Sequence, residues 1–367
     1  MEILLRNGLQ DEFLSPLVSK PSLAVTNRPA IVDPRDDHTS PTSQTGQPGR
    51  QVKWMNPVFL DTHPRSPVQS AKLSQWGKSS RPGIRYVETG SVCFRVREGG
   101  SSGSTLVLFA DGPNALEHHD AIFDRLAQWS GVVAVDPPGF GFSTPESNFD
   151  FTLRAFADAY AALLTALGRG PYVLCPTCTN VYPVALIAAE HPDLVSHVVL
   201  MQALEWDQER IWTSKIVDPN GDLARPYAGQ TFNYQMCAAA AEAWYPNALG
   251  DSAKVTSFLR QSCDCFAHQG NFCVASLIQT WFGPDGRRPA FPPFNQPALA
   301  VWGLNDRSHR KSNKRSLLSI APHATFVERE GVGHFPEIED PAWFEGLLKQ
   351  FLADNPMQAG SEKSTLP

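Results

Sequence analysis

The chain has 367 residues and a formal net charge of −6 at pH 7. Hydrophobic residues make up 42% of it and charged residues 19%, an ordinary globular balance that suffices for a large core. The acidic balance argues against nucleic-acid or anionic-membrane binding, and no apolar run reaches the ~18 residues of a membrane-spanning helix. The seven cysteines include one Cys-x-x-Cys pair, Cys175 with Cys178, which predicts neither a disulfide scaffold nor a zinc ribbon. We therefore expect a cytoplasmic protein without a secretory signal.

Both ends of the chain differ in composition from its middle. Residues 1–80 contain nine prolines and many Ser, Thr, Asn and Gln residues. Such a segment buries too little apolar surface to offset the entropy lost on ordering. We predict a Pro/Ser-rich, partly disordered N-terminal extension over residues 1–80 and a disordered tail over residues 354–367. A partner-binding role for the extension remains an alternative.

From residue 81 onward, short apolar runs alternate with segments of helical spacing. The predicted hairpin and strands cover residues 83–87, 91–98, 105–110, 132–135, 172–175, 198–201, 298–302 and 325–327. The predicted helices between and after them cover residues 151–167, 181–190 and 341–352. This alternation predicts an α/β fold with a mostly parallel sheet flanked by helices, built from residues 81–204 and 294–353.

Between these two parts the strand signal disappears. Residues 205–293 show helical spacing at 232–243 and 252–261, and they predict a helical lid over the carboxyl end of the sheet, where open α/β sheets bind ligands. The lid is rich in aromatic residues. We expect most of them to be core and a few, with Trp206 and Trp281 as the candidates, to line an apolar substrate pocket.

Cys178 stands where a buried strand leads directly into a helix. A side chain at such a turn is presented at the top of the sheet. The N-terminus of the following helix stabilises negative charge and favours a thiolate. The backbone N–H of Thr179 would face an oxyanion that develops beside Cys178.

Three separated motifs resemble those of the α/β-hydrolase family. The run Pro176-Thr177-Cys178-Thr179-Asn180 resembles the family's G-x-S-x-G nucleophile elbow, with Cys in place of Ser and both flanking glycines replaced. Asp306, which ends Trp302-Gly303-Leu304-Asn305-Asp306, matches the acid, and His334, within Gly331-Val332-Gly333-His334-Phe335-Pro336, matches the histidine. The resemblance implies an α/β-hydrolase fold, with Cys178, His334 and Asp306 as a catalytic triad for acyl chemistry.

The pattern departs from the family after the strand at residues 105–110. The family usually has His-Gly-x there, and the backbone N–H of x is the second oxyanion donor. Here the run is Asp111-Gly112-Pro113-Asn114, so Pro113 falls at x and has no N–H to donate. Either Asn114 replaces it as the donor, or the chemistry does not need a complete oxyanion hole. These residues also form a tight turn readily.

Several other interpretations of the same residues remain open. Cys178 could be a small buried hydrophobe or a redox partner of Cys175. Glu205 and Asp207 are a second candidate acid site. The run from Glu117 to Asp120 (Glu-His-His-Asp) is a weak metal candidate, since adjacent residues of a helix point in different directions.

Three functions follow from these motifs. The preferred one is a hydrolase or acyltransferase that acts through Cys178 on an ester, thioester or lactone of an apolar or aromatic small molecule. The second is a non-hydrolytic cyclisation, lyase or transfer step with His334 as general base. The third is a catalytically silent ligand-binding protein. We expect no metal and no cofactor, and the sequence leaves the oligomeric state open.

Overall fold

The computed structural model describes residues 58, 61, 81–101, 103–268, 270–283 and 288–357. Almost all of the predicted N-terminal extension and most of the predicted tail lie outside these residues. No helix in the described part of the chain combines the length and the apolar composition needed to cross a membrane.

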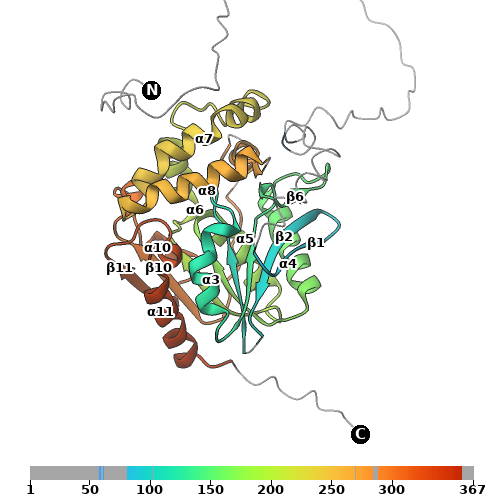
Figure 1. Cartoon of the computed structure of the whole chain (residues 1–367), viewed down its shortest axis with the longest axis vertical. Helices are drawn as coiled ribbons and strands as arrows, with labels where there is room; N and C mark the ends of the chain where they lie inside the picture. The colour runs from blue at the N-terminus through green and yellow to red at the C-terminus, as the bar shows by residue number, and fades with distance from the viewer. Residues whose placement is uncertain are drawn as a thin grey trace, which may run out of the picture. The chain divides into compact units, whose positions relative to one another are not determined.

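A mostly parallel sheet forms the centre of the described chain. Its strands are β1 (Ile84–Glu88), β2 (Val92–Gly99), β3 (Thr105–Phe109), β4 (Gly131–Val135), β7 (Tyr172–Pro176), β8 (Val195–Met201), β10 (Ala298–Gly303) and β11 (Thr325–Arg329). Their spatial order is β1-β2-β4-β3-β7-β8-β10-β11 (Figure 1). β1 and β2 form an antiparallel hairpin, β2 also pairs antiparallel with β4, and all pairs from β4 to β11 are parallel. The predicted fold class is therefore confirmed.

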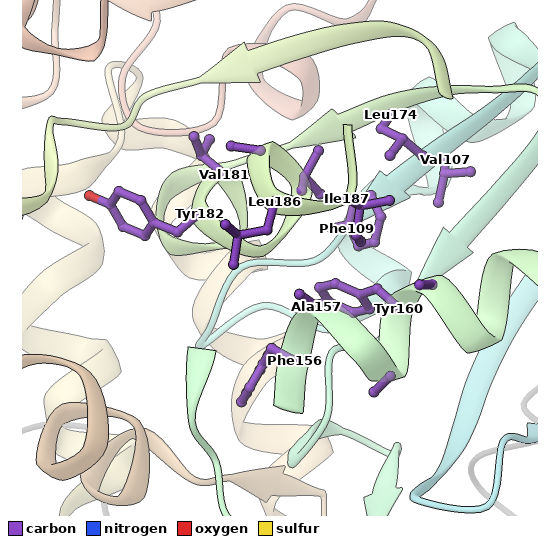
Figure 2. Close-up of a cluster of buried hydrophobic side chains, with 14 of the residues drawn as sticks. Val107, Phe109, Phe156, Ala157, Tyr160, Leu174, Val181, Tyr182, Leu186 and Ile187 are labelled. Carbon is purple, nitrogen blue, oxygen red and sulfur yellow. The ribbon is translucent and has the colours of Figure 1, made fainter. Parts of the chain in front are cut away.

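Helices cover both faces of this sheet, because the central strands are apolar on both sides. In β3, Leu106 and Leu108 pack with α3 (Asp120–Leu126) and α11 (Pro341–Asp354). The alternate residues Val107 and Phe109 belong to the cluster on the opposite face, as the two-residue period of a strand requires. That face is covered by α4 (Leu153–Leu167) and α5 (Val181–Glu190). Figure 2 shows this cluster, with β3 and β7 residues against Phe156, Ala157 and Tyr160 of α4 and Val181, Leu186 and Ile187 of α5.

The predicted lid segment is mainly helical. It contains α6 (Trp206–Trp212), α7 (Ala228–Ala248), α8 (Val255–Ala267) and α9 (Val274–Leu277), the π-helical turns η4 (Thr213–Val217) and η6 (Ile278–Phe282), and the 3₁₀ turn η5 (Ser252–Lys254). α7 and α8 pack against each other at one end of the sheet (Figure 1, yellow and orange). One difference from the prediction is β9 (Asn271–Phe272), a short strand that pairs with β5 (Phe140–Gly141). A pair of this length has no periodicity from which it could be predicted.

Short elements complete the fold. They are β6 (Thr144–Pro145), which pairs with β2, and the 3₁₀ turns η2 (Leu116–His119), η3 (Cys178–Asn180), η7 (Arg307–His309) and η8 (Ser316–Ser319), with the single-turn helix α10 (Pro336–Glu339). Three of them, η3, η7 and α10, begin at or directly after a residue of the predicted triad or its motif. The residues of the predicted triad therefore lie at the carboxyl end of the sheet.

Candidate active site

Cys178 occupies a sharp turn between β7 and α5. Its φ is +53°, in the left-handed region that is costly for a residue with a side chain. Neighbouring contacts hold the turn, since the Tyr160 hydroxyl donates to Asn180 Oδ1 at 2.6 Å and Asn180 Nδ2 donates to the Ala110 carbonyl at 3.1 Å. Such a strained strand-to-helix turn is the backbone geometry of a nucleophile elbow.

His334 and Asp306 form a buried, directly hydrogen-bonded pair. His334 Nδ1 lies 2.7 Å from Asp306 Oδ2, and the side chains of both residues are fully buried. Asp306 also accepts from Gln202 Nε2 at 3.0 Å and from the Ser308 backbone N–H at 2.9 Å. Burial opposes the ionised form, but the His334 charge and hydrogen bond lower the pKa of Asp306 below its usual value. Asp306 is thus a fixed carboxylate that orients the imidazole.

On the side of the His334 ring away from Asp306, the Cys178 thiol lies near a second carboxylate, that of Asp111. A carboxylate oxygen of Asp111, Cys178 Sγ and a ring nitrogen of His334 all lie within 4.8 Å of one another. Asp111 Oδ2 is 3.6 Å from His334 Nε2. The predicted residues Cys178, His334 and Asp306 are therefore brought together, and Asp111 joins them. Sequence reasoning treated Asp111 as a turn residue, although its place directly after β3 puts it at the same sheet edge.

Burial governs the protonation of this group. Burial is the largest cause that raises the pKa of Asp111. Interactions with the His334, Cys178 and Thr179 side chains lower this pKa, but they offset burial only in part. Burial also raises the pKa of the Cys178 thiol, and the charges of Asp111 and Glu209 raise it further, partly opposed by His334. The resting residue is therefore a thiol. This differs from the thiolate expected from the helix N-terminus, because burial of the thiol, together with the charges of Asp111 and Glu209, disfavours the ionised form.

His334 is a strong proton acceptor in this position. Burial by itself lowers the pKa of an imidazole, but Asp306, Cys178 and Asp111 together raise the pKa of His334 well above its usual value. Its Nε2 atom has no hydrogen-bond partner among the described residues. Because a raised pKa favours the protonated imidazole, the ring can take the thiol proton only from its neutral form.

The lid holds the loop in which the second oxyanion donor was expected. Tyr245 of α7 donates its hydroxyl to Asn114 Oδ1 at 2.6 Å, and Ser262 of α8 donates to the Pro113 carbonyl at 2.9 Å. The Asn114 backbone N–H already donates to the Asp111 carbonyl at 2.8 Å. Asn114 Nδ2 is buried without a partner in the described chain, so the side-chain amide is the available donor. Thr179 is half-buried at the start of η3.

The two tryptophans predicted to line the pocket lie within an aromatic cluster. Trp206 and Trp281 are stacked with centroids 6.0 Å apart, and Trp206 meets the ring of Tyr182 at 4.9 Å. Tyr182 is one helical turn after Cys178, which puts the cluster beside the site. Trp244 of α7 contacts the His334 ring directly, with centroids 5.0 Å apart. The aromatic cover of the lid therefore reaches the imidazole.

Glu209 is a further site residue that sequence reasoning missed. It is fully buried on α6, and neither of its carboxylate oxygens has a hydrogen-bond partner among the described residues. Burial first, and then the charge of Asp111, raise its pKa to about 7, partly opposed by His334. The helical spacing of α6 could have indicated it, since Glu209 lies three residues after the buried Trp206.

The second candidate acid site has another role. Glu205 Oε1 and Asp207 Oδ2 pair with Arg288 at 2.9 and 3.2 Å, and Glu205 also caps the start of α6. The acid that is hydrogen-bonded to the imidazole is Asp306. A hollow on the lid contains none of the predicted site residues, and it is lined by Asp222, Arg225, Tyr227, Ala228, Thr231, Phe232 and Gln235.

Two groups among the described residues bring together side chains of the types that bind metals. They are Asp111 with Cys178 and His334, and Asp306 with His309 and His334. Sulfur, imidazole nitrogen and carboxylate oxygen are all zinc ligands, so the first group could hold a metal as well as transfer protons. The weak metal candidate in the sequence has other partners, since the Glu117 carboxylate pairs with buried Arg95.

Comparison with known proteins agrees with this fold. Residues 112–225, which include Cys178, match the family model described as alpha/beta hydrolase fold. A 1-acylglycerol-3-phosphate O-acyltransferase of Arabidopsis thaliana is 23% identical over 307 residues, 75% of this chain and 71% of that protein. A 2-(acetamidomethylene)succinate hydrolase of Mesorhizobium japonicum is 33% identical over 120 residues, 31% of this chain and 41% of that protein. An epoxide hydrolase of Bacillus megaterium, solved with an inhibitor, has a TM-score of 0.59 at 14% identity, covering 73% of this chain and 100% of that chain.

The protein therefore has the α/β-hydrolase fold. Its curated relatives include a hydrolase and an acyltransferase.

Proposed function

We propose that the protein is a cysteine-dependent hydrolase or acyltransferase that acts on an apolar or aromatic acyl compound. The observation that carries this proposal is the meeting of Cys178 Sγ, at a left-handed turn after β7, with an imidazole that is itself hydrogen-bonded to Asp306 at 2.7 Å. A nucleophile, a base and an orienting carboxylate in this arrangement are the requirements of nucleophilic acyl transfer.

The reaction begins from the Cys178 thiol and the neutral form of the His334 imidazole, the form that can accept a proton. As Sγ attacks the acyl carbon, His334 Nε2 takes the thiol proton and Asp306 stabilises the imidazolium. The carbon–sulfur bond forms while the carbonyl electron pair moves to oxygen, which faces the Thr179 backbone N–H and the free Asn114 amide. Collapse of this intermediate expels the leaving group with the proton from His334. Water or a second molecule then releases the acyl group from sulfur.

The surroundings of the site support the substrate class. Trp244 contacts the His334 ring, and Trp206 and Trp281 pack with Tyr182, four residues after Cys178. This aromatic surface favours an apolar acyl chain or ring over a sugar. The relatives named above are an O-acyltransferase and a hydrolase by name, which supports a proposal of this reaction class. A nucleophilic thiol also requires a reducing compartment, which accords with the cytoplasmic location that we propose.

The test is covalent capture of the acyl group. The full chain is incubated with a panel of aryl esters, lactones and acyl thioesters, and turnover and intact mass are measured for the wild type and for Cys178→Ala. The proposal predicts an acyl adduct on the wild type, and no adduct and no turnover with Cys178→Ala. Cys273→Ala, which removes another buried thiol, is the matched control and keeps the adduct.

A specific observation favours a second candidate, a non-hydrolytic reaction with His334 as general base. The resting thiol is held protonated by burial and by Asp111, which makes Cys178 a poor preformed nucleophile. Full turnover by Cys178→Ala together with an inactive His334→Ala would select this candidate. If neither variant changes any turnover while ligands still bind, the protein is a ligand-binding relative without catalysis.

A further inference from the structure

We propose that Glu209 of α6 is a specificity-determining residue, whose carboxyl group accepts a hydrogen bond from a hydroxyl or amide N–H group on an otherwise apolar substrate. This substrate class rests on the proposed function and narrows it, because the acyl compound then carries one hydrogen-bond donor close to the bond that reacts.

Glu209 lies on the buried face of α6, between two tryptophans. Trp206, Glu209 and Trp212 are spaced three residues apart and are all buried, so their side chains lie on one broad face of the helix. Trp206 packs against the Tyr182 ring, with centroids 4.9 Å apart, and Trp212 lies over the His334 ring, with centroids 6.3 Å apart. Glu209 therefore lies between the aromatic cluster beside the nucleophile turn and the imidazole.

The Glu209 carboxyl group lacks a hydrogen-bond donor within the described part of the chain. The side chain is fully buried, and neither of its oxygens accepts a hydrogen bond from those residues. The Tyr182 hydroxyl does not supply one, since it donates its proton to the Leu204 carbonyl at 2.9 Å. A buried acceptor without a donor costs free energy, and a donor on a bound substrate removes that cost.

Several other buried carboxyl groups are compensated by the protein itself. Glu117 and Asp136 both pair with the buried Arg95 side chain. Glu339 accepts from two backbone N–H groups, at 2.8 and 2.9 Å. Glu209 differs from these groups because its partner is missing at the place where the substrate binds.

The aromatic surroundings determine what kind of molecule brings the donor. Pockets for small molecules are mostly apolar, and a small number of polar groups fix the orientation of the ligand. A carboxyl oxygen can accept the hydrogen bond whether or not the group carries its own proton. Glu209 is also close enough to Cys178 for its charge to raise the pKa of the thiol, so the donor belongs near the acyl group.

The test measures binding to the full chain. The probes are pairs of phenylacetamides that carry either a hydroxyl or a methyl group at the meta or para position of the ring, and calorimetry gives their dissociation constants. For the better of the two positions, the wild type should bind the hydroxyl member about 10–10²-fold more tightly than the methyl member.

Two variants of Glu209 and one control separate its role from a general effect. Glu209→Leu should reduce the preference for the hydroxyl member below threefold, because no acceptor remains. Glu209→Gln retains the size of the side chain and one acceptor oxygen, so it should keep part of the preference. Gln208→Leu, an exposed neighbour on the same helix, is the matched control and should behave as the wild type.

The stability of the variants adds a readout that a structural role would move in the opposite direction. Replacing an unpartnered buried carboxyl by an apolar side chain should leave the urea midpoint of unfolding unchanged or raise it. If Glu209→Leu does not fold, the preference in Glu209→Gln decides.

A wild type that binds both members of each pair within threefold overturns the inference, and so does an undiminished preference in Glu209→Gln. Full turnover by Cys178→Ala contradicts the proposed function instead. The binding preference, measured without any reaction at Cys178, tests Glu209 separately.

Discussion

The sheet and the lid contribute to the site in different ways. β7 is buried along its whole length, and its backbone places Cys178, while the ends of β10 and the loop after β11 place Asp306 and His334. The lid instead reaches the site through single side chains, such as Tyr245 and Glu209, and much of the rest of α7 is exposed. The comparison indicates that the sheet positions Cys178, Asp306 and His334, and that the lid contributes single side chains that hold the loop beside them.

Gly333 shows how closely these two regions approach each other. A Cβ atom at this position would collide with the Ala248 carbonyl at the end of α7. The neighbouring His334 N–H donates to the same carbonyl at 2.8 Å. The histidine loop is therefore fitted against the lid as well as against the sheet, and the division of roles can be tested by changing one region at a time.

The largest effect is expected on the sheet side, for Asp306→Asn. The amide retains the size of the side chain but loses the charge that stabilises the imidazolium and selects its tautomer. We expect kcat to fall by about 10⁴-fold with little change in KM. The measurement is steady-state kinetics with the best ester of the panel. A loss below tenfold would contradict the role of Asp306 and would return Glu205 and Asp207 to consideration.

A smaller effect on stability is expected for Glu337→Gln, behind the nucleophile turn. Glu337 Oε1 accepts the Thr177 hydroxyl at 2.9 Å, and burial raises the pKa of this carboxyl group to about 7. Because the folded pKa is raised above the usual value of 4.5, the proton on Glu337 stabilises the folded state fully below pH ~4.5, and this contribution is lost as the pH rises through about 7.

Glu337→Gln removes this titration. From the size of the shift we expect the wild-type free energy of unfolding to drop between pH 5 and pH 8 by up to about 3 kcal/mol more than that of the variant. Urea unfolding at both pH values measures the difference, and the exposed Glu330→Gln serves as the control. An equal drop in Glu337→Gln and the wild type would show that Glu337 is ionised in the folded protein.

The smallest effect is expected on the lid side, for Tyr245→Phe. The change removes the hydroxyl that holds Asn114 Oδ1, so the amide donor loses its fixed orientation. A hydrogen bond of this kind contributes about 1 kcal/mol, so kcat should fall by up to about tenfold while KM stays the same. Tyr86→Phe, whose hydroxyl has no hydrogen-bond partner among the described residues, is the control. If KM rises and kcat does not change, Tyr245 contacts the substrate and does not orient Asn114.

The sequence predicted strands and helices correctly where the pattern that specifies them is local. The apolar runs at residues 105–110 and 172–175 predicted β3 and β7, because a strand buried on both faces is continuously apolar. The spacing in residues 232–243 predicted only the middle of α7, which runs from Ala228 to Ala248. Its ends follow from contacts with η7 and the histidine loop, which local propensity does not contain.

By itself, the sequence determined the order of strands and helices and the three motifs whose residues meet, Cys178, Asp306 and His334. It could do so because each motif is short and lies directly after a strand whose apolar pattern is visible. Only the tertiary structure decided that Asp111 and Glu209 join them and that Asn114 keeps a free amide. Those outcomes depend on burial and on charges from distant parts of the chain, and burial is a property of the packed whole.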